Sequence, residues 1–418
     1  MTYPRLAILA TSWVLWACGH DGGHGNKPDA PGMPTALTVT RSGSPVAGVH
    51  TYFLNADSSL VATVDTDAAG TASAVVGAGG SVTALDPFTS ASAAAMEGDD
   101  LRTFLGVQPG DQLALTQTDA KSTTFTLKVA AASNANTYDV LTSCGAASVV
   151  PGGGAGGRVT LFNCHGAADI VILASALNGV IKVPVSGLYH PNVALTDGGT
   201  VDLTGDTYRA LTGVTFNYAN APNATISISH TLVSAAGGLA PFVTAFTGKP
   251  ATLQEPTIAG ATEVVDTTVG LTSKHHVVEW GPLAATYMLD LANVLLPDLT
   301  AAPSFSAATK LVSWTEGAAG AAPDLTTTTI DVARSDGSRH WHWTVAGPYT
   351  AGTLAFPVLP TDVTDWAPAA TDRVSVTALT NAKVPGGYAA VRAHVHDVRD
   401  PTELIAGPSG RVVTVRSP

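Results

Sequence analysis

The chain has 418 residues, of which 45% are hydrophobic and only 12% are charged. Twenty basic residues stand against 32 acidic ones, which gives a formal net charge of −12 at pH 7. This composition excludes a charge-rich disordered chain. It also excludes a nucleic-acid-binding protein, because phosphate binding needs clustered Lys and Arg and the sequence has no such cluster. The length predicts two to four domains.

The first eighteen residues are typical of a secretory signal. Arg5 supplies a positive charge, and an uncharged apolar run follows from Leu6 to Trp16. The run is too short to span a bilayer, and it ends in a small residue followed by the first cysteine, Cys18. We therefore predict a signal peptide over residues 1–17 and an extracytoplasmic mature chain.

The same segment resembles a bacterial lipoprotein signal. In that family the cysteine at the cut receives lipid on its thiol and its amine, so the resemblance implies palmitate-type lipidation of Cys18 and attachment to a membrane. Gly19 follows where an Asp tends to hold such proteins at the inner membrane, which implies the outer membrane of a Gram-negative bacterium. The alternative is an ordinary signal peptide with a chance cysteine. Residues 18–34, rich in Gly, Pro, His and Asp, are interpreted as a flexible tether.

Residues 35–88 hold short runs of alternating apolar and polar residues separated by turn signals, a pattern typical of strands. Two motifs in this segment, Pro45 to Val49 and Thr66 to Ala72, resemble carboxypeptidase-regulatory-like and bacterial immunoglobulin-like modules. The second motif contains the turn Asp67-Ala68-Ala69-Gly70. The resemblance implies a small β-sandwich without catalytic machinery of its own.

A second strand-rich block covers residues 105–235 and contains Cys144 and Cys164. Each cysteine follows a strand-like segment, and a Gly-rich stretch from Pro151 to Gly157 separates them. In an oxidising compartment this pair favours a structural disulfide over reactive thiols or a metal site. Such a bridge closes a loop of about 20 residues and is worth roughly 3 kcal/mol in chain entropy.

Residues 250–300 are predicted to form a third β-rich segment. Within it, Tyr287 to Leu296 carries apolar residues at helical spacing before Pro297, which predicts one short helix or, alternatively, a further strand. The last block, 301–418, is again strand-like, and its Val312-Ser313-Trp314 region is loosely similar to fibronectin type III modules.

The end of the last block is predicted to close the fold with two strands. These are Tyr388 to Val398 and Arg411 to Arg416. Asp336-Gly337 is interpreted as a hairpin turn between two earlier strands of the same block.

Two His-x-His pairs lie in this block, His340 with His342 and His394 with His396. In a strand, residues i and i+2 point to one face, so each pair presents two imidazoles together. If the two strands are neighbours, the four nitrogens could hold one metal ion. The interpretation that we favour leaves these histidines exposed or paired across strands, while Trp341 and Trp343 take the core.

Motifs for catalysis are missing from the sequence. It contains neither a Gly-x-Ser-x-Gly elbow nor a His-Glu-x-x-His helix, and its Gly-rich run lacks the ending of a phosphate loop. Trp366 is the best candidate for stacking on a sugar, because it lies between Asp365 and Pro368 in a loop-like stretch. The alternative for Trp366 and the other tryptophans is a place in the core.

The sequence therefore predicts an all-β protein, with several immunoglobulin-like β-sandwich domains in tandem after a signal peptide and a flexible tether. We expect no enzymatic activity and no cofactor. The expected function is that of an envelope scaffold, adhesin or binding protein, held at the membrane by its lipid, with a surface glycan or an envelope protein as partner. Two alternatives stay open: a carbohydrate-binding lipoprotein, and a metal-dependent site at the paired histidines.

Overall fold

The computed structural model describes residues 32–85, 100–117, 122–149, 157–162, 166–178, 181–222, 224–234, 237–238, 242–246, 250–317, 320–394 and 408–417. About 60% of the structure is strand and 5% is helix, which confirms the predicted β class. The signal peptide, Cys18 and most of the tether lie outside the described residues. Within the described ranges, no helix is both long enough and apolar enough to cross a membrane.

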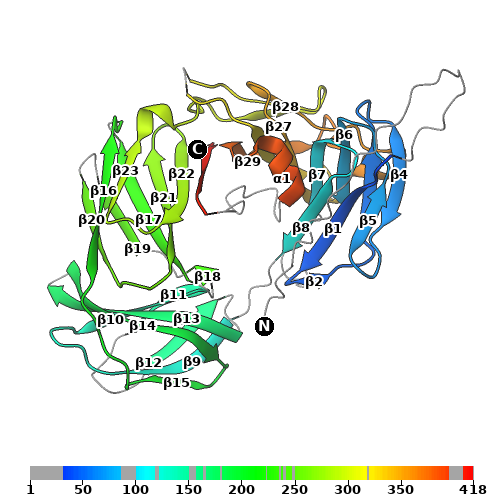
Figure 1. Cartoon of the computed structure of the whole chain (residues 1–418). Helices are drawn as coiled ribbons and strands as arrows, with labels where there is room; N and C mark the ends of the chain where they lie inside the picture. Colours follow the sequence, from blue (N-terminus) through cyan, green and yellow to red (C-terminus); the bar gives the residue numbers. More distant parts are fainter. Residues whose placement is uncertain are drawn as a thin grey trace, which may run out of the picture.

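A thirteen-stranded sheet forms the spine of the molecule (Figure 1). From one edge to the other it runs through β18 (Gly237–Gly238), β17 (Thr225–Ser234), β21 (Thr262–Gly270), β22 (Lys274–Pro282), β30 (Gly410–Arg416), β29 (Arg373–Lys383), β26 (Leu325–Ala333), β27 (His340–Pro348), β7 (Asp100–Val107), β6 (Gly80–Leu85), β3 (His50–Leu54) and β4 (Leu60–Asp65), with β19 (Phe242–Phe246) paired to β17. The pairing between β27 and β7 is parallel, and the other pairs are antiparallel. The spine thus joins strands from the beginning, the middle and the end of the chain.

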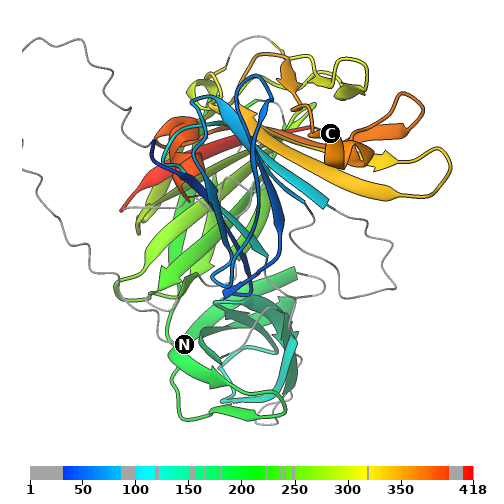
Figure 2. The ribbon, with the colours of Figure 1, turned by 90° about the vertical axis from the view of Figure 1, so that its right-hand side faces the viewer.

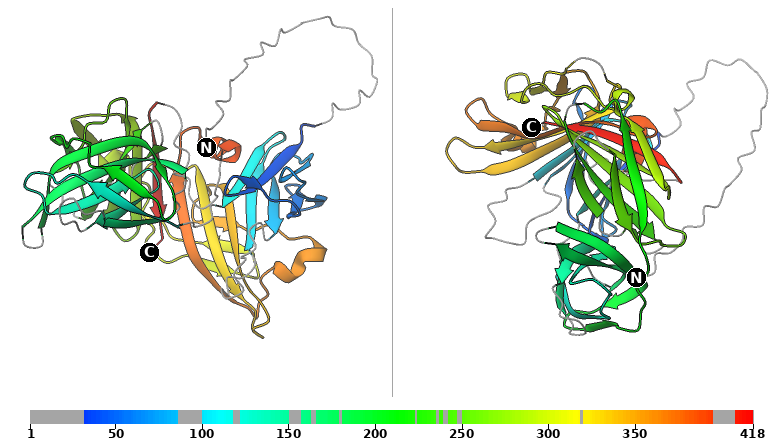
Figure 3. Two further views of the ribbon diagram at one scale, coloured as in Figure 1. Left: turned by 90° about the horizontal axis from the view of Figure 1, so that it is seen from below. Right: turned by 90° about the vertical axis from the view of Figure 1, so that its left-hand side faces the viewer.

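Three smaller sheets cover parts of the spine. They consist of β2 (Ser44–Pro45), β1 (Thr35–Arg41), β5 (Thr71–Ala74) and β8 (Gln112–Gln117); of β20 (Ala251–Glu255), β16 (Thr212–Ala219) and β23 (Thr286–Asp290); and of β24 (Ser304–Ser306), β25 (Leu311–Ser313) and β28 (Thr353–Ala355). The first packs on β3, β6 and β7, and the second on β17 and β21. The third lies over β27, and Figure 3 shows β26, β27 and β29 between the green and blue modules.

A separate sandwich is formed by the chain between β8 and β16. One of its sheets holds β12 (Gly157–Phe162), β9 (Ser122–Val129) and β15 (Thr200–Leu203); the other holds β11 (Gly145–Val149), β10 (Thr137–Thr142), β13 (Gly166–Asn178) and β14 (Ile181–Leu195). The sandwich has its own core and lies at one end of the molecule (Figure 2). The apolar side chains of Leu141 and Val171 pack it against Leu232 of β17.

In strand β27 buried apolar side chains alternate with half-buried polar ones, so the two faces of the spine differ at this strand. Trp341, Trp343 and Val345 point to one face and are at most 1% exposed, whereas His340 and His342 point to the other and are half-buried. The tryptophans belong to the largest hydrophobic core, which the third covering sheet and the chain around it close. Their predicted place in the core is therefore confirmed.

The region Tyr287 to Leu296, for which a helix was the first prediction, is not an α-helix. It starts within β23 and then makes a single 3₁₀ turn, η1 (Leu291–Asn293). The side chain of Asp290 caps this turn by accepting a hydrogen bond from the backbone nitrogen of Ala292. The strand alternative was the better one, because Tyr287 and Leu289 pack against neighbouring strands.

The second local correction concerns the strand predicted from Tyr388 onwards. The structure has a helix there, α1 (Gly387–His394), while the strand predicted at Arg411 to Arg416 is confirmed as part of β30. Gly386 turns the chain with φ +77° just before the helix. Tyr388 and Val391, three residues apart, then bury the same helix face against the spine.

The Asp67–Gly70 turn gives a first testable prediction. Gly70 has φ +72°, and a Cβ added to it would lie 2.5 Å from the backbone oxygen of Val39. We expect Gly70→Ala to lower the free energy of unfolding by about 2 kcal/mol or more. Gly43 also has a positive φ but has open space around it, so Gly43→Ala should cost only about 1 kcal/mol. Denaturant unfolding of both variants tests this, and equal losses would exclude the clash as the cause.

Candidate functional site

Strands β26, β27 and β7 gather polar side chains on the face of the spine opposite the tryptophans. In the strand register Asp331 lies directly opposite His342 on one side, and Asp100 lies opposite it on the other. His340, two residues before His342, shares this face. A row of carboxylate, imidazole and carboxylate therefore crosses three neighbouring strands.

The side chains of this row are in contact. The Nε2 atoms of His340 and His342 lie 2.8 Å and 3.2 Å from the same oxygen, Oδ2 of Asp331. The Nδ1 atom of His342 lies 3.4 Å from Oδ1 of Asp100. One donor atom from each of Asp331, His340 and His342 lies within 4.8 Å of the others. Among the described residues, these three side chains form the group that could hold a metal ion.

Arg102 fixes the far end of the row. Its side chain is 5% exposed, and its guanidinium donates to Oδ2 of Asp100 at 2.8 Å and to Oγ1 of Thr344 at 3.1 Å. Burial raises the pKa of the Asp100 carboxyl, but the hydrogen bond from His342 and the charge of Arg102 outweigh it, so this pKa lies below its usual value. The hydrogen bond to Asp100 in turn raises the pKa of the His342 imidazole against the effect of burial.

The structure brings together half of the predicted histidine set. His340 and His342 lie side by side, with ring centroids 5.4 Å apart. The side chain of His394 and all of His396 lie outside the part of the chain that the structure describes. The helix that carries His394 is held towards the other end of β27, where the Tyr388 hydroxyl donates to the backbone oxygen of Ala346.

Two carboxylates of the row were not recognised in the sequence. A signal for Asp331 was present, because a hairpin centred on Asp336-Gly337 places Asp331 opposite His342. Asp100 had no such signal, since its strand pairs with β27 across some 240 residues of sequence.

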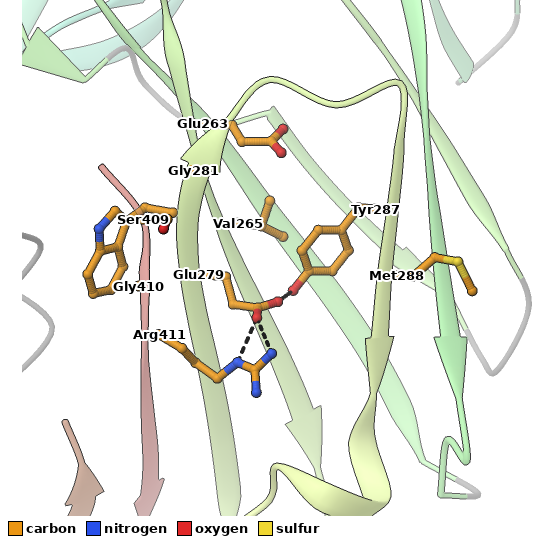
Figure 4. Close-up of a pocket in the computed structure, with 10 residues that line it drawn as sticks. Glu263, Val265, Glu279, Gly281, Tyr287, Met288, Ser409, Gly410 and Arg411 are labelled. Carbon is orange, nitrogen blue, oxygen red and sulfur yellow. Dashed lines mark hydrogen bonds and ion pairs between the residues drawn. The ribbon is translucent and has the colours of Figure 1, made fainter. Parts of the chain in front are cut away.

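A second polar site is a groove of about 440 Å³ where β30 pairs with β22 (Figure 4). At its centre the carboxylate of Glu279 accepts hydrogen bonds from the Tyr287 hydroxyl and from the Arg411 guanidinium, whose Nε lies 2.6 Å away. Burial raises the pKa of Tyr287 far above its usual value, so the phenol keeps the proton that it donates. Glu263 lines the same groove from strand β21.

Next to the groove, His230 is fully buried between two glutamates. Its Nδ1 lies 2.7 Å from Oε2 of Glu255, and its Nε2 lies 3.1 Å from Oε2 of Glu263. Burial by itself lowers the pKa of His230, but the two carboxylates outweigh it and raise the pKa to about 9. An imidazolium at neutral pH therefore neutralises part of the acidic charge inside this module.

The charged groups of the groove thus form ion pairs and hydrogen bonds with neighbouring side chains. Glu279 is held by Arg411 and Tyr287, and Glu263 is held by His230. A general acid or base has to exchange its proton with a bound substrate. These carboxylates instead hold strands β21, β22 and β30 to their neighbours, and the arrangement favours a structural role.

Trp366 does not form the predicted stacking surface. It ends η2 (Thr361–Trp366), is 8% exposed, and packs edge to face on Trp341. The guanidinium of Arg339 lies 3.5 Å from the centre of its ring, so a cation occupies the face that a sugar would need. The other tryptophans of the described ranges are also buried: Trp280, Trp314, Trp341 and Trp343. The prediction of stacking at Trp366 is therefore wrong.

The cysteines are only partly described. Cys144 is half-buried in the turn between β10 and β11. Cys164 and Cys18 lie outside the described residues, so the Cys144–Cys164 bridge and the lipid anchor stay predictions.

Comparison with known proteins gives no family for this chain. No family model matches it, and no curated protein matches its sequence. Among solved structures it is similar to the Bacillus anthracis TIE protein, at 12% sequence identity and a TM-score of 0.15. The match covers 62% of this chain and 49% of that protein, so it spans about half of that protein's length. A likeness at this TM-score carries no argument about function.

Proposed function

We propose that this chain is a non-enzymatic envelope protein, anchored through lipid on Cys18 at the outer membrane of a Gram-negative bacterium. Its role is that of a scaffold, adhesin or binding protein. Its body consists of immunoglobulin-like sandwiches that share strands. The observation that carries the proposal is the thirteen-stranded spine, which unites the beginning, middle and end of the chain in one sheet.

A shared sheet suits a protein that binds rather than one that closes over a substrate. The largest core contains Tyr52, Ile226 and Val415, so side chains from three distant parts of the sequence pack in one cluster. Hydrogen-bonded ladders across the modules resist hinge motion, whereas many enzymes depend on closing lids or domains. Loops mounted on rigid elements keep a fixed geometry for a partner.

The burial of the described tryptophans bears on the partner. A carbohydrate-binding surface of the expected kind needs an exposed aromatic strip, and each tryptophan of the described ranges is at most 8% exposed. This favours an envelope protein over a surface glycan as the partner, and it weakens the carbohydrate-binding alternative.

The anchor is tested by expressing the full chain in a Gram-negative host supplied with a labelled palmitate analogue. We expect the label on the wild-type chain, which should sediment with the outer membrane, and no label on Cys18→Ser. Cys144→Ser serves as the matched control and should keep the label. Equal labelling of wild type and Cys18→Ser would contradict the anchor.

The binding role is tested in the same cells. Crosslinking on intact cells should give a defined adduct with the anchored chain that is lost with Cys18→Ser. An identical adduct pattern in both strains would contradict a role that depends on anchoring. Turnover of a small molecule by the purified full chain would contradict the non-enzymatic role.

A further inference from the structure

We propose that Asp331, His340 and His342 bind one divalent transition-metal ion of the zinc type. This site takes a carboxylate from β26 in place of the second histidine pair that the sequence suggested. It is independent of the envelope role, because it rests only on the row that crosses β26, β27 and β7.

The donor atoms are already close to the spacing that such an ion needs. Zinc binds imidazole nitrogen and carboxylate oxygen at roughly 2.0–2.2 Å in a tetrahedron, which places neighbouring donor atoms about 3.4 Å apart. The Nε2 atoms of His340 and His342 lie 2.8 Å and 3.2 Å from Oδ2 of Asp331. Two of the three donor-to-donor distances therefore lie within about 0.6 Å of the tetrahedral spacing, and all three donor atoms lie within 4.8 Å of one another.

For His342 the row also contains the outer contact that a metal-bound histidine usually has. A ligating imidazole typically donates its second N–H to a carboxylate, which fixes the ring orientation. His342 points Nε2 towards Asp331 and Nδ1 towards Asp100, so Nε2 faces the proposed metal position beside Asp331 while Nδ1 is held by Asp100. Asp100 is itself fixed by the buried Arg102. This support distinguishes the row from an ordinary surface pair such as His190 with Asp206, for which the described residues supply no third metal-binding group.

The chemistry of the donors selects the class of ion. Two imidazoles with one carboxylate suit zinc, cobalt or nickel, whereas magnesium and calcium prefer oxygen donors alone. The charges of Asp331 and Asp100 exceed that of Arg102 by one, which favours a cation. The side chains of His340 and His342 are 41% and 34% exposed, so the ion can enter from solvent and keep a water ligand in the fourth position.

The test uses the full chain and titration with Co²⁺, whose visible absorption reports the ligand geometry, followed by displacement with Zn²⁺. His20 and His24 of the tether are replaced by alanine in every protein, since they could bind the ion loosely. We expect one equivalent of Co²⁺ with tetrahedral bands. Affinity should fall at least about 100-fold in His342→Ala and Asp331→Asn, and about 10- to 100-fold in Asp100→Asn, which removes only an outer contact.

Control variants separate loss of the metal site from non-specific binding and from loss of the fold. His190→Ala removes a surface histidine of similar exposure and should leave Co²⁺ binding unchanged. Asp331→Asn keeps the shape of the side chain, and its circular dichroism and thermal unfolding without metal should match those of the parent. Absence of stoichiometric binding in the parent would overturn the proposal. So would a loss in His394→Ala/His396→Ala as large as that in His340→Ala/His342→Ala, which would restore the four-histidine site instead.

Discussion

Replacing Trp343 by alanine is expected to lower the free energy of unfolding by about 4 kcal/mol, because burial of a large aromatic side chain is lost and a cavity remains. The ring is 1% exposed and packs edge to face on Phe356, with centroids 4.9 Å apart. Its Nε1 donates to Oγ1 of Thr103 at 2.9 Å. That hydrogen bond links β27 to β7, so the substitution weakens the joint between the last and the first modules.

Denaturant unfolding of the full chain, followed by tryptophan fluorescence and by circular dichroism, measures the loss. Trp343→Phe keeps most of the apolar volume and should cost about 1–2 kcal/mol, since it mainly removes the hydrogen bond. In a double-mutant cycle with Thr103→Val, the coupling between the two sites measures the Trp343–Thr103 hydrogen bond, while Thr103→Val has an extra cost because it also removes the partner of the buried Thr83 hydroxyl. A loss below about 1.5 kcal/mol in Trp343→Ala would contradict the role of this side chain in the shared core.

The sequence predicted the local geometry of the fold well, because strand periodicity is a local property. The alternation predicted Trp341 and Trp343 in the core, and their burial confirms it. The prediction was weaker for segments without clear alternation, where contacts with the rest of the fold determine whether the chain forms a helix or a strand. Tyr388 belongs to a helix because Gly386 turns the chain and the spine offers an apolar face to cover.

The sequence alone could not show which strands lie next to one another in the sheet. Periodicity shows which side chains share a face, but it says nothing about which strand lies alongside. The tandem arrangement suggested by the sequence pairs strands within each module. In the structure, β7 pairs with β27, and β30 inserts between β22 and β29. These contacts cross the predicted limits at 235 and 301, and no turn signal marks them.

The difference between local periodicity and strand pairing also explains which residues of the polar row could be predicted. His340 and His342 could be found, because they are two apart in one strand. Asp331 could have been found from the hairpin turn, whereas Asp100 depends on the parallel pairing of β7 with β27. Trp366 was misplaced because no sequence pattern indicates that Arg339 covers its ring.

Replacing His230 by glutamine is expected to cost about 3–5 kcal/mol of the free energy of unfolding at pH 6, because Glu255 and Glu263 would then be buried without a cation. The pKa of His230 is about 9 in the folded chain, against 6.5 for an ordinary histidine. A raised folded-state pKa means that the protonated ring stabilises the fold fully below about pH 6.5. This contribution is lost as the pH rises through about 9, and it amounts to about 3 kcal/mol.

The wild-type chain should therefore lose stability between pH 6.5 and 9, and the loss should be absent in His230→Gln. Urea unfolding of both proteins at pH 6, 7.5 and 9.5 measures the gap between them, which should be largest at pH 6 and should nearly close at pH 9.5. His190→Gln removes a half-exposed histidine and serves as the control, with a stability profile close to that of the wild type. A gap between wild type and His230→Gln that stays constant over this range would show that the ring contributes through packing against Phe216 and not through its charge.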